Sequence, residues 1–234
     1  MDFKNASWPD DRKVLLRYLN SLSNTKYRDF SKKLIPGDVY MLGVNLPTLK
    51  KIAKEIAKGD YERFLKTDDG GLFEFKYLKG QVIASIKDVD EYERYFWRYL
   101  PSITDWSLCD GFIASSKIIR EHKEKFFDIA KGLIESSDEF EMRVGFVILL
   151  DHLVCEEYVD RIFRLIRGFE SEFYYANMAL AWLICELYIK YPKETQSFLS
   201  SKPISLEVLK MSERKIKDSY RVSVQDKEWL KKLR

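Results

Sequence analysis

The chain has 234 residues, of which 46% are hydrophobic, and its 40 Lys and Arg against 37 Asp and Glu give a formal net charge of +3. This apolar content can bury a large core and excludes intrinsic disorder, while so small a net charge does not by itself indicate a nucleic-acid partner. The longest uncharged apolar runs, such as VGFVILL, are far shorter than a membrane span, and the N-terminal MDFKNASWPDDRK lacks the apolar core of a signal peptide. We therefore expect a cytoplasmic protein that does not associate with membranes.

Cysteine and histidine are scarce and widely spaced. Cys109, Cys155 and Cys185 form no C-x-x-C pair, and His122 and His152 cannot complete a ligand set with them. We expect buried, reduced thiols rather than disulfides, and no metal site.

The spacing of apolar residues predicts helices along the whole chain and almost no alternating strand pattern. Boundary residues agree, because Pro47 suits a first helical turn, Gly59 can end that helix, Asp105 is a fair N-cap and Pro192 follows a helix end. In chain order, the predicted helices cover residues 10–22, 27–35, 47–59, 61–66, 72–86, 89–103, 104–119, 123–136, 139–154, 158–169, 172–192, 193–200, 205–220 and 226–233.

The predicted helices pair at intervals of roughly 35 to 40 residues, the spacing of degenerate HEAT-type repeats. No linker separates two halves, and so many helices do not fit a four-helix bundle. We therefore predict one all-α domain over residues 1–234, an α-solenoid of antiparallel helix pairs with a concave groove. Such a groove is a binding surface, although most α-solenoids bind proteins rather than nucleic acids.

The segment TDWSLCDGFIASSKII is the most informative stretch of the chain. At about 100° per residue, Trp106 and Asp110 lie roughly 40° apart, away from the packed face. Beside them, Gly111 and Ala114 leave room for a large partner, and Lys117 could meet a phosphate. The alternative is a half-exposed Trp106 that covers a neighbouring helix, with Asp110 solvated. The predicted packed face consists of Leu108, Cys109, Phe112, Ile113, Ser116 and Ile119.

Two later helices carry further candidates. The predicted helix 139–154 is apolar nearly all round except for Arg143, whose guanidinium must find an anion because burying it unpaired is costly. Glu139, one turn earlier, a DNA phosphate and Asp110 are all possible partners.

Trp182 shares a helix face with Tyr175 and Met178. It is either a buried core residue or part of the aromatic wall of a groove.

Several motifs, in this order, resemble the AlkD-like family of DNA alkylation repair proteins, which are HEAT-like-repeat DNA glycosylases. The motifs are MLGVNLPTLKKIAKEI, DWSLCD with MRVGFVILL, YYANMALAWLICELY and RKIKDSYRVSVQDKEWLKKLR. The resemblance runs from about Tyr27 to the C-terminus and implies the solenoid fold with double-stranded DNA, alkylated or distorted, in its groove.

Active members of this family remove cationic N3- and N7-alkylated purines from duplex DNA without flipping the lesion into a pocket. Their pattern is a Trp and an Asp one turn apart, an Arg on a later helix and a second Trp later still. Carried onto this sequence, the pattern implies a site made of Trp106, Asp110, Arg143 and Trp182, without metal or cofactor. Tyr27 falls in the resembling region but has no assigned role.

The resemblance also suggests what each residue does. An ionised Asp110 would stabilise the sugar cation and hold a water. Trp106 and Trp182 would flank the deoxyribose, and Arg143 and Lys117 would hold backbone phosphates.

The basic excess of the chain lies at its C-terminal end. Residues 202–234 contain ten Lys and Arg against five Asp and Glu, whereas the preceding residues carry a net charge of −2. This excess is either a solvated helix face or a source of non-specific DNA affinity through Arg214, Lys215, Lys217 and Arg221.

Two positions depart from the family pattern. Asp105 stands where Asn is commoner, and Gly111 follows the candidate catalytic Asp110 where a hydroxyl residue is more usual. The prediction is a monomeric, monofunctional alkylpurine DNA glycosylase. The alternatives are a non-catalytic protein that binds branched or distorted DNA and a protein-binding helical scaffold.

Overall fold

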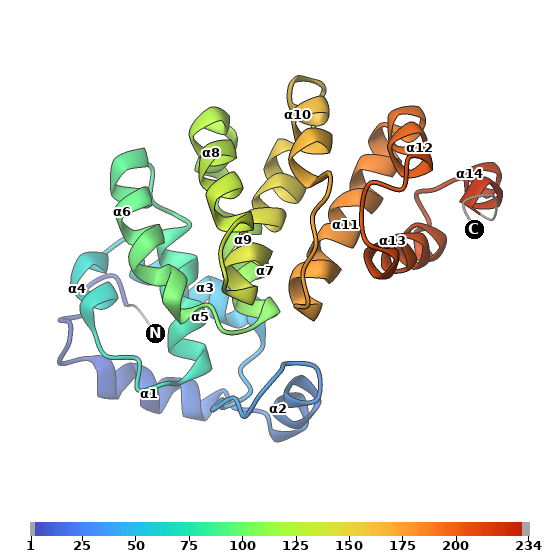
Figure 1. Ribbon diagram of the computed structural model, residues 1–234. Coiled ribbons are helices and arrows are strands. Elements are labelled where there is room, and N and C mark those ends of the chain that lie inside the picture. Colours follow the sequence, from blue (N-terminus) through green and yellow to red (C-terminus); the bar gives the residue numbers. More distant parts are fainter. Residues whose placement is uncertain (1–2, 231–234) are drawn as a thin grey trace. The chain divides into compact units, whose positions relative to one another are not determined.

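A computed structural model describes residues 3–230, and these residues form fourteen α-helices and three short 3₁₀ or π turns, with no strand among them (Figure 1). The predicted all-α class is therefore confirmed. Every predicted helix has a counterpart, although residues 231–233 of the last one lie outside the described part of the chain.

The chain divides into two compact units, residues 1–118 and 119–234. The prediction of one continuous domain stays a prediction. None of the helices in the described residues is long and apolar enough to cross a membrane.

The first unit is built around helix α5, whose residues are nearly all buried. Helices α3, α4, α6 and α7 pack against it. The elements of this unit are α1 (Arg12–Ser21), α2 (Thr25–Lys32), α3 (Leu46–Ile56), α4 (Tyr61–Lys66), α5 (Phe73–Ile83), α6 (Val89–Tyr99), the 3₁₀ turn η1 (Leu100–Ser102) and α7 (Trp106–Ser115).

Side-chain caps explain several helix starts. Asn45 accepts a hydrogen bond from the backbone N–H of Thr48, and Pro47 lies in the first turn of α3 as predicted. Pro192 likewise begins a helix directly after the preceding one ends. These boundaries follow from local chemistry, which is why the sequence predicts them.

A buried carboxylate ties the segment between α2 and α3 to the centre of the first unit. Glu74 of α5 is fully buried, and its Oε1 accepts backbone N–H groups from Leu42 (3.0 Å), Gly43 (2.8 Å) and Val44 (3.2 Å). Gly43 has φ +89°, and a Cβ there would collide with the carbonyl oxygen of Asn24 at the start of α2. Glu74 therefore fixes a backbone conformation that lets α2 approach closely.

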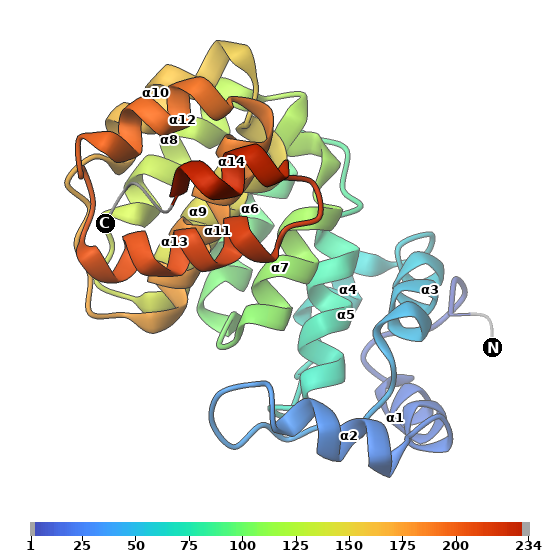
Figure 2. The same ribbon diagram turned by 90° about the vertical axis from the view of Figure 1, so that its right-hand side faces the viewer.

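The second unit is built around helix α11, which packs against α9, α12 and α13. Figure 2 shows α13 beside α11. The elements are the 3₁₀ turn η2 (Lys117–Arg120), which begins at the end of the first unit, α8 (Lys123–Ile134), α9 (Glu139–Ile148), the π turn η3 (Leu149–Leu153), α10 (Glu156–Ile166), α11 (Tyr174–Lys190), α12 (Pro192–Ser200), α13 (Leu206–Asp218) and α14 (Val224–Trp229).

The thiols are free, and two of the three lie where the sequence predicts. Cys109 and Cys185 are buried, and burial raises the pKa of Cys185 to about 11. Cys155 is only half-buried, so its predicted burial is wrong. It precedes α10 at the surface, where the Lys123 ammonium lies 3.9 Å from its sulfur.

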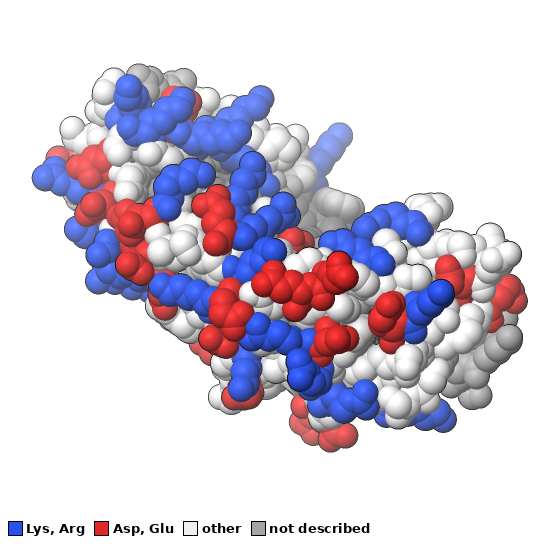
Figure 3. Space-filling model, turned by 90° about the horizontal axis from the view of Figure 1, so that it is seen from above, with Lys and Arg blue, Asp and Glu red and all other residues white. Residues whose placement is uncertain are grey.

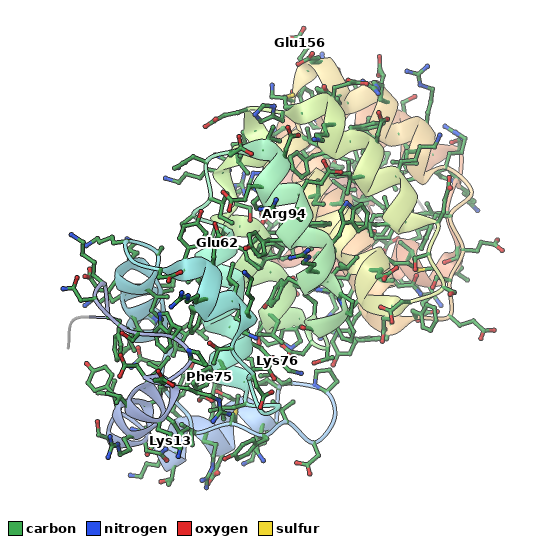
Figure 4. All side chains as sticks on the ribbon, turned by 90° about the vertical axis from the view of Figure 1, so that its left-hand side faces the viewer. Lys13, Glu62, Phe75, Lys76, Arg94 and Glu156 are labelled. Carbon is green, nitrogen blue, oxygen red and sulfur yellow. The ribbon has the colours of Figure 1, made fainter. Side chains whose placement is uncertain are left out.

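The Glu74 interaction predicts a large loss of stability on substitution. In Glu74→Gln the amide NH₂ would face N–H donors, so we expect the free energy of unfolding to fall by about 2–4 kcal/mol in urea denaturation. Glu62→Gln, at an exposed position on α4 (Figure 4), is the control and should change it by less than about 0.5 kcal/mol. Equal unfolding midpoints for the two variants would contradict this account.

Candidate functional site

Helix α7 begins where a capped aspartate fixes its first turn. The Asp105 Oδ1 accepts hydrogen bonds from the backbone N–H of Ser107 (2.9 Å) and Leu108 (3.0 Å) and from the Ser107 hydroxyl (2.6 Å). The predicted N-cap is confirmed, and it places Trp106 as the first helical residue.

The other oxygen of Asp105 is less well satisfied. Oδ2 is buried without a hydrogen-bond partner, and the residue is 1% exposed. Burial raises the pKa of Asp105 above its ordinary value, although the hydrogen bonds from Ser107 and Leu108 oppose the shift. An Asn would cap the helix equally well without this buried charge, so the departure from the family pattern has a physical cost.

The predicted packing face of α7 is confirmed, since all its residues are buried. Trp106 and Asp110 are half-buried, and Ala114 is exposed. The predicted length of the helix is wrong: the backbone leaves helical geometry at Ser116 (ψ 72°), so Lys117 is the exposed first residue of η2 rather than part of α7.

Trp106 lies against a pocket built by the segment that Glu74 holds. The Trp106 indole Nε1 donates to the carbonyl oxygen of Leu34 (2.9 Å). Tyr27, whose role the sequence leaves open, lines the same pocket of about 160 Å³. Its other lining residues are mostly apolar: Phe30, Ser31, Leu34, Ile35, Met41, Gly43, Val44, Leu46, Phe73 and Ser107.

The glycine after Asp110 is required by packing. A Cβ on Gly111 would lie 2.9 Å from Cε2 of Tyr77 on α5. The Tyr77 hydroxyl is buried without a hydrogen-bond partner, and burial raises its pKa to about 12. Gly111 thus lets α7 approach α5 closely, and the hydroxyl residue usual in the family has no space here.

A second hollow lies at the C-terminal end of α7. Lys117 lines it together with Lys50, Lys54 and Lys87; we call it the lysine hollow. Sequence reasoning finds only Lys117, because Lys50 and Lys54 are two of several lysines on a surface helix.

Arg143 lies in the second unit, on α9, and is 5% exposed. Its Nη1 donates to the carbonyl oxygen of Tyr175 (3.0 Å), while Oε1 of Glu139 accepts the backbone N–H of Tyr175 (2.6 Å). Both charged residues therefore reach the first turn of α11.

Trp182 is half-buried on α11, so its interpretation as a buried core residue is wrong. It shares a half-buried stripe with Tyr175 and Met178, as the helical period predicts. The Lys215 ammonium lies 5.7 Å from the centroid of the Trp182 ring, within reach of a cation–π interaction.

The C-terminal cations differ in their surroundings. Arg214 is exposed, whereas Lys217 pairs with Glu213 (3.3 Å) and Arg221 with Glu186 (2.8 Å). Glu213 is buried, whereas Arg221 is exposed, and an ion pair with an exposed cation is worth at most about 1 kcal/mol, so a DNA phosphate could compete for Arg221. On the face shown in Figure 3, basic and acidic side chains are interspersed.

The predicted site residues are divided between the two units. Trp106 and Asp110 belong to the first unit, together with Lys117, whereas Arg143 and Trp182 belong to the second, with the C-terminal cations. That these residues face one groove stays a prediction.

The sequence matches a family model described as DNA alkylation repair enzyme over residues 15–221. No curated protein and no solved structure matches the chain. The matched range includes every predicted site residue.

The contact between Gly111 and Tyr77 predicts opposite effects for two Gly→Ala substitutions. Gly111→Ala should lower the free energy of unfolding by about 1–3 kcal/mol through overpacking. Gly132→Ala, at a helical position with open space around it, should raise it by about 0.5–1 kcal/mol. Urea denaturation measures both, and two stabilising substitutions would show that Tyr77 does not limit position 111.

The buried Asp105 predicts a pH-dependent effect. Its pKa is higher in the folded than in the unfolded chain. Stability is therefore lost as pH rises from the unfolded pKa of Asp105 through its folded pKa. Asp105→Asn removes that loss. The free energy of unfolding of Asp105→Asn minus that of the native chain should therefore be larger at about pH 7 than at about pH 4, so the variant gains stability relative to the native chain as pH rises. Urea denaturation at both pH values is the measurement, and an unchanged difference would mean that Asp105 does not titrate as inferred.

Proposed function

The chain belongs to the DNA alkylation repair enzyme family, and on this premise we propose that it hydrolyses the N-glycosidic bond of cationic N3- and N7-alkylated purines in duplex DNA. The observation that carries the proposal is the outer side of α7. There an aromatic ring and a carboxylate, Trp106 and Asp110, are half-buried one turn apart, and the exposed Ala114 follows.

Cleavage of the glycosidic bond of an alkylated purine does not require the protein to activate the leaving base. Alkylation at N3 or N7 gives the purine a positive charge, so the base takes the electron pair of the breaking glycosidic bond and leaves as a neutral molecule. No leaving-group protonation, metal or cofactor is needed. The cationic centre that remains is the sugar, which has oxocarbenium character.

Asp110 is the residue proposed to meet that cation. A carboxylate beside C1′ stabilises the developing positive charge electrostatically and can orient a water. The water adds to C1′ and gives up a proton to bulk solvent, which yields an abasic site; the free base has already left with the electron pair of the glycosidic bond. Half-burial suits this role, because a partly desolvated carboxylate interacts more strongly than one in bulk water.

The aromatic and basic residues are proposed to hold the duplex around that carboxylate. The faces of Trp106 and Trp182 would each favour the sugar cation by about 0.5–2 kcal/mol. Arg143 and Lys117 would contact backbone phosphates, which position DNA without reading its sequence. Arg214 and its neighbours on α13 would add salt-dependent affinity.

The proposal includes the predicted fold-level arrangement: a single monomeric solenoid of HEAT-like repeats with duplex DNA in its concave groove. Packing within each unit supports it. Helices α3, α5 and α7 pack in succession, as do α9, α11 and α13. Stacked helix pairs have this pattern, because each pair contacts mainly its neighbours.

A non-catalytic function, binding of branched or distorted DNA, is the alternative. The observation that favours it is the departure of α7 from the pattern of the active members at Asp105 and Gly111, each next to a proposed catalytic residue. Binding through backbone phosphates would require neither Asp110 nor a labile base.

Release of free bases from methylated duplex DNA tests the proposal. The native protein should release 7-methylguanine and 3-methyladenine, and Asp110→Asn should slow single-turnover release by about 100-fold or more. Asp128→Asn, at an exposed position on α8, is the matched control and should act like the native protein. If the native protein releases neither base above the spontaneous rate while it binds branched DNA, the non-catalytic alternative is correct.

A further inference from the structure

The lysine hollow is a basic surface in the first unit, and of its four lysines the proposed function uses only Lys117. It has a volume of about 450 Å³, and its lining includes four lysines and no acidic residue. The lysines come from three elements: Lys50 and Lys54 from α3, Lys87 from the segment after α5, and Lys117 from η2.

None of the four lysines has a carboxylate partner within residues 3–230, and all four side chains are exposed. Lys50 and Lys54 are four residues apart on one helix, so their Cβ atoms lie about 5–6 Å apart. Like charges this close repel one another, which favours an anion among them.

The remaining polar groups of the hollow are already satisfied. The Gln81 Nε2 donates to the carbonyl oxygen of Gly111 (2.7 Å), and its Oε1 accepts the Ser115 hydroxyl (2.9 Å). The Ser85 hydroxyl donates to the carbonyl oxygen of Val82 (2.6 Å). The lysine ammonium groups are therefore the groups that can meet a ligand.

The helix ends around the hollow do not cancel its charge. Residues from the C-terminal parts of α3, α5 and α7 line it. Each helix C-terminus carries roughly −0.5 of a charge, so three such ends offset less than half of the charge of four lysines. The hollow therefore keeps a net positive charge, and a ligand with several negative charges would complement it.

The position of the hollow relative to Asp110 indicates which polyanion it takes. Ala114, which lines the hollow, follows Asp110 by one helical turn on the same side of α7, about 6 Å along the axis. A duplex bound with a sugar against Asp110 would therefore bring backbone phosphates next to the hollow.

We propose that the lysine hollow binds backbone phosphates of duplex DNA next to the sugar that faces Asp110. The inference rests on the proposed function for the position of the DNA. Because ammonium groups contact phosphates without reading bases, the hollow fixes the register of the strand on α7 and does not select a sequence.

Binding to undamaged duplex DNA tests this inference separately from base release. The hollow variant is K50Q/K54Q/K87Q, which leaves Lys117 in place. The matched control is K13Q/K51Q/K66Q, which removes the same charge from exposed lysines of the first unit outside the hollow; Figure 4 labels Lys13 on α1.

Affinity is measured by fluorescence anisotropy between about 50 and 200 mM salt. We expect the hollow variant to bind at least about tenfold more weakly than the control, with a salt slope smaller by about one to three. Equal affinities and slopes for the two variants would overturn the inference, as would failure of the native protein to bind duplex DNA at low salt. The native protein could also bind DNA and release no base, while the hollow variant loses affinity as expected. That result would support DNA binding by the lysine hollow and contradict only the glycosylase proposal.

Discussion

The first unit depends on one buried carboxylate. Glu74 offers its negative charge to three consecutive backbone N–H groups, and this fixes the left-handed conformation of Gly43 against the start of α2. Residues of that segment and of α2 then form the pocket beside Trp106. The indole in turn donates to the carbonyl oxygen of Leu34. The orientation of a proposed catalytic side chain is thus determined by a hydrogen-bonded charge on another helix.

A second constraint places the carboxylate of the proposed site. Tyr77 of α5 occupies the space that a side chain at Gly111 would need, so α7 lies close against α5 with its buried stripe inward. Asp110, beside Gly111, is left half-buried on the outer side. The close approach also brings the C-terminal ends of α3, α5 and α7 around the lysine hollow. Packing thus accounts for a departure from the family pattern.

Local chemistry explains how much of this the sequence predicts. Helix starts at Asp105 and Pro47 follow from capping and backbone restriction, and the buried face of α7 follows from its period. The early end of α7 at Ser115 does not follow from periodicity, because the apolar residues keep their helical spacing as far as Ile119 while the backbone leaves helical geometry at Ser116. Long-range partners cannot be predicted from spacing along the sequence either. No spacing pairs Glu74 with a loop about thirty residues earlier, and none places Lys87 in the hollow that Lys54 lines.

The proposed stabilisation of a sugar cation by Asp110 is the step on which the rest of the mechanism depends. It is tested most directly by comparing the affinity for a duplex that contains a cationic pyrrolidine in place of the sugar with that for its neutral tetrahydrofuran counterpart. The native protein should bind the cationic duplex at least about 100-fold more tightly than the neutral one, as expected of a transition-state mimic, and Asp110→Asn should lose this preference. Equal affinity of the native protein for the two duplexes would contradict the proposed stabilisation.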